Sequence, residues 1–162
     1  QLHVIIETNE GLEAAHDIAH SSPRIEALFF GGIDMAAELR CKNGWDQMLY
    51  ARSRVVHAAA SAGLDVIDVP YLDLADLDGM KILAQQAKDL GFAGKGSIHP
   101  KQIAPLNKIF TPSDEEISRA RRIIKTFEDA ETGLVVIDGK LIEKPVMREM
   151  YRIVSIAEKL GH

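Results

Sequence analysis

Two carboxylates stand at or shortly after the ends of apolar runs of the sequence, where they could together hold a metal ion. Glu7 follows the run at 2–6, and Asp34 follows the run at 27–30. If both runs are parallel strands, their carboxyl ends meet at one edge of the sheet, where ligands collect in α/β folds. Carboxylate oxygens suit Mg²⁺ or Mn²⁺, with water or substrate in the other positions. The alternative is that each carboxylate caps the N-terminus of a following helix.

A pair of glycines separates the second run from Asp34. Gly31 and Gly32 let the backbone approach a ligand closely and let its N–H groups point at an anion. A purely structural loop does not require two glycines there, so the pair favours a ligand site. The segment lacks the G-x-G-x-x-G spacing, which argues against a dinucleotide-binding fold.

Two further apolar runs end in polar residues. Asp68 lies in the run at 64–69 and either lines a pocket or begins a turn at Pro70, with the turn favoured. His99 follows the run at 94–98, and a histidine at a strand end is typically a structural hydrogen-bonding partner.

The elements that must position these residues alternate between short apolar runs and longer stretches of helical period. This alternation is the pattern of βαβ units with a parallel sheet, so the predicted fold class is α/β. Strands are predicted at 2–6, 27–30, 64–69 and 94–98, and helices at 12–20, 46–61 and 76–90. An alanine-rich segment at 55–62 allows its helix to approach the sheet closely. Four strands alone form neither a closed barrel nor an open sheet with covered edges.

After residue 100 the pattern changes to a smaller set of elements. Ser113 is followed by Glu116 at the spacing of a capping box, which predicts a helix start. Apolar residues then repeat at helical spacing, and Gly133 is predicted to end this helix region.

A hairpin and a last helix follow. The Asp138-Gly139 pair supplies the positive φ that a two-residue turn needs, which predicts a β-hairpin. Pro145 suits the first turn of a helix that runs to about residue 160. The chain therefore divides into residues 1–112 and 113–162.

Composition excludes several classes of function. The chain has 162 residues, of which 46% are hydrophobic and 27% are charged, and its net charge is -5. Such a chain has no basic field to attract nucleic acid or anionic lipid. Its apolar stretches are far shorter than the ~20 residues that cross a bilayer. The single cysteine, Cys41, forbids an intrachain disulfide and fits a reducing, cytoplasmic compartment.

The first residues are unusual. Gln1 is not an initiator methionine, and an apolar run begins at Leu2 as though the sequence opened inside a strand. We expect that a preceding segment is missing.

Several of these segments together resemble one protein family. They read IET at 6–8 with Gly11 after it, GGIDMAA at 31–37, GFAGKGSIHPKQI at 91–103 and FTPS at 110–113. The chain resembles the citrate lyase β-subunit-like proteins, which include malyl-CoA and citramalyl-CoA lyases, within the HpcH/HpaI aldolase superfamily. The likeness runs through nearly the whole chain, and its most specific part lies at 94–100.

The resemblance implies a (β/α)₈ TIM barrel. Glu7 and Asp34 would end strands five and six, so residues 1–112 would form about the last four β/α units. Residues 113–162 would form a C-terminal extension of helix, hairpin and helix. The first four strands and the family's substrate-holding arginine would lie upstream: either the protein was cut, or the remainder is disordered or supplied by another chain. Half a barrel exposes two strand edges and an apolar face, so we expect an oligomer, and the resemblance implies a trimer.

The activity that the resemblance implies is that of a Mg²⁺-dependent carbon–carbon lyase. Such an enzyme cleaves or forms a 3-hydroxyacyl-CoA thioester, such as citramalyl-CoA, malyl-CoA or citryl-CoA, with acetyl-CoA and a 2-oxo acid as the products of cleavage. Glu7 and Asp34 would bind the metal ion, which polarises the oxo group and stabilises charge on oxygen.

The same resemblance implies two further contacts. Backbone N–H groups of Gly32, Ile33 and Asp34 would hold the substrate carboxylate. His99 and Pro100 would flank the coenzyme A chain.

Glu143 is the candidate general acid or base. The family often carries a G-x-x-x-D-x-P pattern whose aspartate reaches the active site of a neighbouring subunit. Residues 139–145 read GKLIEKP, with glutamate in place of that aspartate. One extra methylene displaces the carboxylate, and a misplacement of ~1 Å can cost ~10²-fold in rate. Glu143 is therefore either the catalyst or a surface residue at the end of the hairpin.

Two other functions stay open at this point. One is a non-catalytic remnant or interaction module of the same fold. The other is a coenzyme A-independent aldolase that acts on free hydroxy acids. The segment at 98–100 and the C-terminal hairpin argue against the aldolase.

Overall fold

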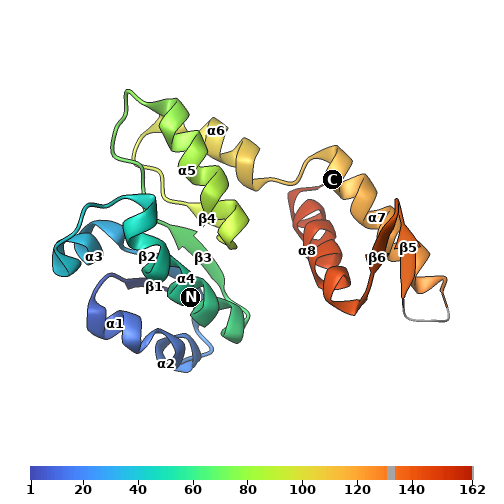
Figure 1. Ribbon diagram of the computed structural model, residues 1–162, viewed down its shortest axis with the longest axis horizontal. Helices are drawn as coiled ribbons and strands as arrows, with labels where there is room; N and C mark the ends of the chain where they lie inside the picture. The colour runs from blue at the N-terminus through green and yellow to red at the C-terminus, as the bar shows by residue number, and fades with distance from the viewer. Residues whose placement is uncertain (131–133, 162) are drawn as a thin grey trace. The chain divides into compact units, whose positions relative to one another are not determined.

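The computed structural model describes residues 1–130 and 134–161, which fall into two compact units (Figure 1). The first unit spans residues 1–110, and the second spans residues 111–162. Each unit buries a hydrophobic core of its own.

The first unit is built on a sheet whose four strands lie side by side in chain order. They are β1 (Leu2–Ile6), β2 (Ile25–Phe30), β3 (Asp65–Asp68) and β4 (Gly94–Lys95). Every pairing is parallel. This confirms the predicted α/β class with a parallel sheet.

β4 is shorter than the strand predicted at 94–98. Its pairing with β3 ends at Lys95. Beyond that residue, the N–H of Ile98 donates to Oε1 of Gln102 over 3.0 Å. This local hydrogen bond takes the place of a sheet partner, so the chain leaves the sheet early.

Helices connect these strands. They are α1 (Asn9–Glu13), α2 (Ala15–His20), α3 (Gly32–Leu39), α4 (Trp45–Ala62), α5 (Leu77–Leu90) and α6 (Pro100–Phe110). The predictions at 46–61 and 76–90 are confirmed by α4 and α5. The single helix predicted at 12–20 is instead two short helices, because Ala14 ends α1 and begins α2. α3 and α6 have no predicted counterpart, since both begin in segments whose glycines or proline are typical of loops.

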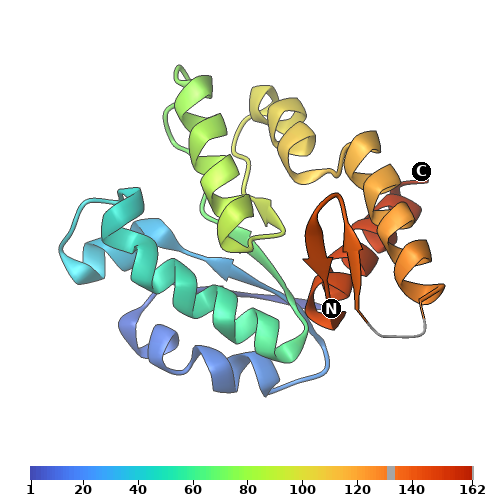
Figure 2. The same cartoon turned by 45° about the vertical axis from the view of Figure 1, so that its right-hand side comes forward.

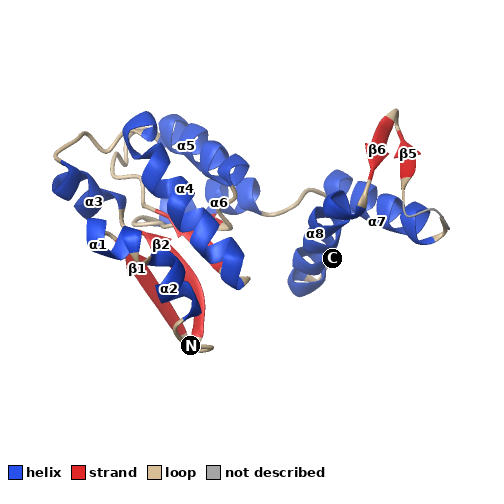
Figure 3. Ribbon diagram, turned by 60° about the horizontal axis from the view of Figure 1, so that its bottom comes forward, coloured by secondary structure: helices blue, strands red, loops and turns tan. Residues whose placement is uncertain are grey.

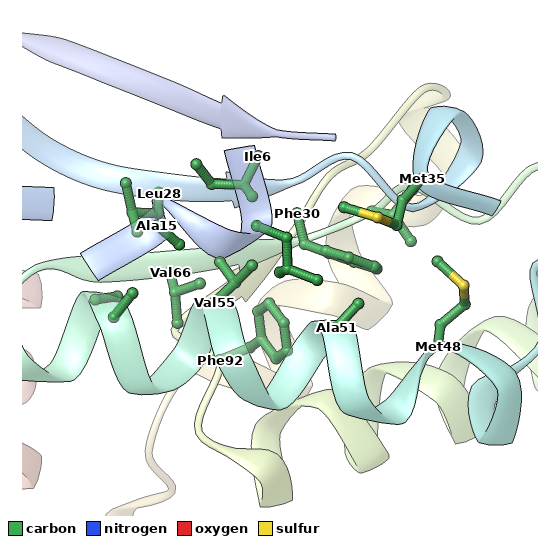
Figure 4. Close-up of a cluster of buried hydrophobic side chains, with 14 of the residues drawn as sticks. Ile6, Ala15, Leu28, Phe30, Met35, Met48, Ala51, Val55, Val66 and Phe92 are labelled. Atoms are coloured by element: carbon green, nitrogen blue, oxygen red, sulfur yellow. The ribbon is translucent and has the colours of Figure 1, made fainter. Parts of the chain in front are cut away.

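The core of the first unit lies between the sheet and α4 (Figure 4). Leu28 and Phe30 of β2 and Ala51 and Val55 of α4 are all buried there. The alanines of α4 allow the close approach predicted for this helix, which runs along the strands (Figure 2). Burial of each large apolar side chain contributes about 1.5–3 kcal/mol to folding.

The sheet also carries apolar side chains that are open to solvent. Ile5 in β1 is 56% exposed. Its neighbour His3 stacks on Phe29 of β2, with ring centroids 5.7 Å apart. Strands of parallel sheets are normally covered on both faces, so this exposure is unusual.

The second unit combines a helix pair with a hairpin. Its elements are α7 (Asp114–Glu128), β5 (Val135–Ile137), β6 (Lys140–Ile142) and α8 (Lys144–Leu160). The predicted capping box is confirmed, because Ser113 Oγ accepts from the N–H of Glu116 and Glu116 Oε2 accepts from the N–H of Ser113. Gly133, the predicted end of the helix region, lies outside the described residues.

The predicted hairpin is also confirmed (Figure 3). Asp138 and Gly139 have φ values of 52° and 73°, the left-handed geometry of a tight two-residue turn. Pro145 lies in the first turn of α8, as predicted. Ile142 and Met147 join the core of this unit. In the part of the chain that the structure describes, every helix is too short or too polar to span a bilayer.

Candidate active site at the carboxyl ends of the parallel strands

The structure places Glu7 and Asp34 after neighbouring strands. β1 and β2 are in register at their ends, with Ile6 opposite Phe30. The N–H of Gly31 donates to the carbonyl of Ile6 over 2.9 Å, so β1 and β2 end at the same level of the sheet. Glu7 follows at once and is half-buried, while Asp34 is an exposed residue in the first turn of α3.

Both glycines after β2 are required by close contacts. A side chain at residue 31 would stand 2.9 Å from Oε2 of Glu7. A side chain at residue 32 would stand 2.8 Å from the ring of Phe30 and 3.2 Å from Val69. Gly31 therefore leaves room for Glu7, the candidate metal ligand, and Gly32 leaves room for the core side chains of Phe30 and Val69.

The capping alternative for the two carboxylates is wrong. Thr8 caps α1, because its hydroxyl oxygen accepts from the N–H of Gly11 over 3.0 Å. The N-cap of α3 is Gly31, which has no side chain to accept a hydrogen bond. Neither Glu7 nor Asp34 is thus an N-cap, although Asp34 lies in the first turn of α3. Gly31 makes no side-chain capping hydrogen bond to the first N–H groups of α3, which have no partner within the helix.

The donor set of this site fits a hard divalent cation. Within residues 1–130 and 134–161, no three histidine, cysteine, aspartate or glutamate side chains come together as a ready-made metal site. Glu7 and Asp34 would then supply two oxygen ligands and leave the other positions to water and substrate. Mg²⁺ commonly binds through one or two carboxylates in this way.

Asp68 corrects one prediction, since it does not begin a surface turn at Pro70. Its side chain is fully buried at the end of β3. Oδ1 accepts from Nε of Arg52 over 2.9 Å, and Oδ2 accepts from Nζ of Lys95 over 2.6 Å. The three side chains join α4 to the ends of β3 and β4.

Arg52 is enclosed by aromatic rings. Its guanidinium carbon lies 5.0 Å from the ring centres of both Phe30 and Trp45. Burial lowers the pKa of Lys95, and the charge and hydrogen bond of Asp68 oppose that shift. The sequence prediction missed Arg52, although an arginine on the buried stripe of α4, between Met48 and Val55, was a usable signal.

Comparisons with known proteins decide the family. Residues 1–100 match the HpcH/HpaI aldolase/citrate lyase family. The chain belongs to this family. An L-malyl-CoA/beta-methylmalyl-CoA lyase of Cereibacter sphaeroides is 31% identical over 98% of this chain and 57% of that protein. The citrate lyase subunit beta of Escherichia coli K12 is 34% identical over 96% of this chain and 53% of that protein.

Solved structures of similar proteins agree with this assignment. The crystal structure of RipC from Yersinia pestis matches with a TM-score of 0.71 and 40% identity, over 72% of this chain and 54% of that one. CitE from Mycobacterium tuberculosis, in complex with magnesium, acetoacetate and coenzyme A, matches with a TM-score of 0.79 and 27% identity, over 95% of this chain and 60% of that one. This HpcH/HpaI family chain spans about half the length of the curated relatives that it matches.

The segment most specific to the HpcH/HpaI resemblance is held by a buried glutamine that the sequence prediction also missed. Gln102 donates Nε2–H to the carbonyl of Tyr71 over 2.8 Å and accepts from the N–H of Ile98. His99 is half-buried, and its Nδ1 accepts from the N–H of Lys101 over 3.1 Å, while Pro100 begins α6. This hydrogen bond supports the structural role considered for His99, that of a hydrogen-bonding partner.

Glu143 lies in the second unit, where it is the N-cap residue of α8. Its side chain is exposed and forms no capping hydrogen bond. Its carbonyl accepts from the N–H of Val146 over 2.9 Å, so the backbone starts the helix. The carboxylate is not used for capping.

Proposed function

We propose that this chain is part of a Mg²⁺-dependent carbon–carbon lyase that acts on a 3-hydroxyacyl-CoA thioester. Citramalyl-CoA, malyl-CoA and citryl-CoA are the candidate substrates, with acetyl-CoA and a 2-oxo acid as products. The observation that carries the proposal is the pair of carboxylates, Glu7 and Asp34, after adjacent parallel strands of an HpcH/HpaI family chain. Relatives named as malyl-CoA and citrate lyases support the choice of reaction.

Glu7 and Asp34 hold the metal ion in this proposal. A bound Mg²⁺ supplies Lewis-acid chemistry, which polarises the carbonyl of the 2-oxo acid and stabilises charge on its oxygen. The two carboxylates fix the position of that charge at the strand ends.

The start of α3 binds the carboxylate of the 2-oxo acid. The N–H groups of Gly32, Ile33 and Asp34 are the first of this helix, and they carry the positive end of its dipole.

Glu143 is the proposed general acid and base. In cleavage the 3-hydroxyl group loses its proton as it becomes the carbonyl of the 2-oxo acid, and the broken carbon–carbon bond leaves a thioester enolate. The enolate carbon takes up one proton to become the methyl group of acetyl-CoA, so the overall proton count is unchanged. In the reverse direction the same carboxylate takes that proton from the acetyl methyl group. An exposed carboxylate that is free of capping bonds supports this role. His99 and Pro100 flank the coenzyme A chain.

The finer architecture is part of the same proposal. Residues 1–112 form four β/α units of a (β/α)₈ TIM barrel, and residues 113–162 form its C-terminal extension. Ile5 of the parallel sheet is exposed. This exposure supports the barrel, because the rest of a barrel would cover that face of the sheet. We further propose a cytoplasmic homotrimer in which Glu143 serves a neighbouring subunit. A monomeric mass in light scattering would count against the trimer.

An activity assay separates this proposal from its rivals. The protein as purified from its source is incubated with citramalyl-CoA, malyl-CoA and free hydroxy acids, with and without Mg²⁺, and release of acetyl-CoA and 2-oxo acid is followed. We expect Mg²⁺-dependent cleavage of a thioester. Cleavage of free acids alone would favour the aldolase, and no product under any condition would favour the non-catalytic remnant.

A further inference from the structure

A cluster of buried charges beneath the strand ends is not electrically balanced. Arg52 and Lys95 share the single carboxylate of Asp68. All three side chains are at most 3% exposed. The cluster therefore holds one positive charge in excess, where water does not reach it.

An excess charge in the interior is costly, and the rings of Phe30 and Trp45 beside Arg52 do not supply the missing negative charge. Burying an ion pair already costs solvation, and a cluster that served stability alone would pair each charge. Nη1 of Arg52 is also buried without a hydrogen-bond partner among the described residues. Departures from such packing rules concentrate at functional sites.

One aromatic ring separates this cluster from the start of α3. The guanidinium carbon of Arg52 lies 5.0 Å from the centre of the Phe30 ring. An atom of the same ring lies 2.8 Å from the place that a side chain on Gly32 would occupy. An apolar ring screens charge far less than water does, so the field of the cluster reaches the first N–H groups of α3.

We propose that Arg52 is a positioning residue for anion binding at the start of α3, acting through the excess positive charge that it shares with Asp68 and Lys95. The inference rests on the proposed function, in which α3 holds the carboxylate of a 2-oxo acid beside Mg²⁺ at Glu7 and Asp34. The excess charge attracts that carboxylate and repels the metal ion. Its removal must therefore change the two affinities in opposite directions.

Four variants test this sign difference. Arg52→Met removes one positive charge and leaves Asp68 paired with Lys95. Lys95→Met removes one positive charge and leaves Asp68 paired with Arg52. Arg52→Lys keeps the charge. Arg54→Met is the matched control, because this arginine lies on the same helix and pairs with Glu13 at the surface.

Isothermal titration calorimetry measures the Kd of Mg²⁺ alone and the Kd of pyruvate at saturating Mg²⁺. Far-ultraviolet circular dichroism and thermal unfolding report on the fold. We expect Arg52→Met and Lys95→Met each to weaken pyruvate binding and tighten Mg²⁺ binding, both by roughly three- to tenfold. Arg52→Lys and Arg54→Met should leave both constants close to those of the unmodified protein.

Other outcomes overturn the inference. A structural defect would weaken the binding of both Mg²⁺ and pyruvate, and a charge without influence would change neither Kd. Either result is incompatible with the inference. If the unmodified protein binds both ligands and the variants fail to shift them in opposite directions, the inference fails alone. If the unmodified protein binds neither ligand, the proposed function fails and the inference fails with it.

Discussion

The side chain of Glu7 lies against Gly31, in the space that a side chain at residue 31 would fill. Such a side chain would stand 2.9 Å from Oε2 of Glu7 and would collide with its Cβ. The φ of Gly31 is -87°, which any residue adopts. The requirement for glycine therefore comes from the approach of Glu7, the proposed metal ligand, and not from backbone strain.

Gly31→Ala should damage the metal site through this contact. The new methyl group displaces Glu7, so we expect Mg²⁺ affinity to fall by roughly tenfold and the free energy of unfolding to fall by ~1–3 kcal/mol, as for other overpacked sites. Calorimetry and urea denaturation measure the two quantities. In the double variant Gly31→Ala/Glu7→Gly the collision is relieved, so stability should recover while Mg²⁺ binding does not. Simple additivity of the two stability changes would contradict the contact.

Glu7→Gln and Asp34→Asn should each weaken Mg²⁺ binding by roughly tenfold or more, because each removes a negative charge and an oxygen ligand. Both side chains keep their size, so the fold should be unchanged by circular dichroism. Glu10→Gln is the charge-matched control, since Glu10 is an exposed residue of α1 close in sequence to Glu7. Equal Mg²⁺ affinities in all three variants would contradict the assignment of Glu7 and Asp34 as metal ligands.

Glu143→Gln should suppress turnover by about 10²-fold and leave Mg²⁺ binding intact, because it removes the proton donor and not a ligand. Glu143→Asp restores the residue type expected from the family pattern and should keep or raise the rate. Steady-state kinetics with a thioester substrate measures both. Unchanged kinetics in Glu143→Gln would make the residue a surface group at the end of the hairpin.

The pKa of Tyr71 is raised from 10.0 to about 12, chiefly by the hydrogen bond from its hydroxyl to Oδ2 of Asp76 at 2.6 Å. A raised pKa means that this bond stabilises the fold below the ordinary pKa of 10.0, and that its contribution is lost as pH rises through about 12. Asp76→Asn should lower the pKa of Tyr71 toward its ordinary value, as measured by ultraviolet titration of tyrosinate.

Two features make this variant a clean test. Asparagine keeps the N-cap of α5, where Oδ1 of Asp76 accepts from the N–H of Gly79 over 2.8 Å. Tyr71→Phe identifies which part of the titration belongs to this residue. A Tyr71 pKa that stays near 12 in Asp76→Asn would show that the hydrogen bond is not its cause.

Several elements were determined by the sequence because their interactions are local. Ser113 and Glu116 are three residues apart, and the turn at Asp138 and Gly139 needs only the φ freedom of its own residues. The first three strands were also predictable as short, mostly apolar runs, because both faces of a parallel sheet are normally buried. The positions of Glu7 and Asp34 at strand ends followed directly from that pattern.

The tertiary structure decided what depends on contacts between distant residues. Asp68 lies 16 residues from Arg52 and 27 residues from Lys95 along the chain, so no local spacing indicates that the three charges meet. Gln102 likewise donates a hydrogen bond to the carbonyl of Tyr71, 31 residues away along the chain, and no local spacing indicates this contact. A residue type and its near neighbours fix helices and turns, whereas burial and charge pairing appear only when the packed chain excludes water from a particular side chain.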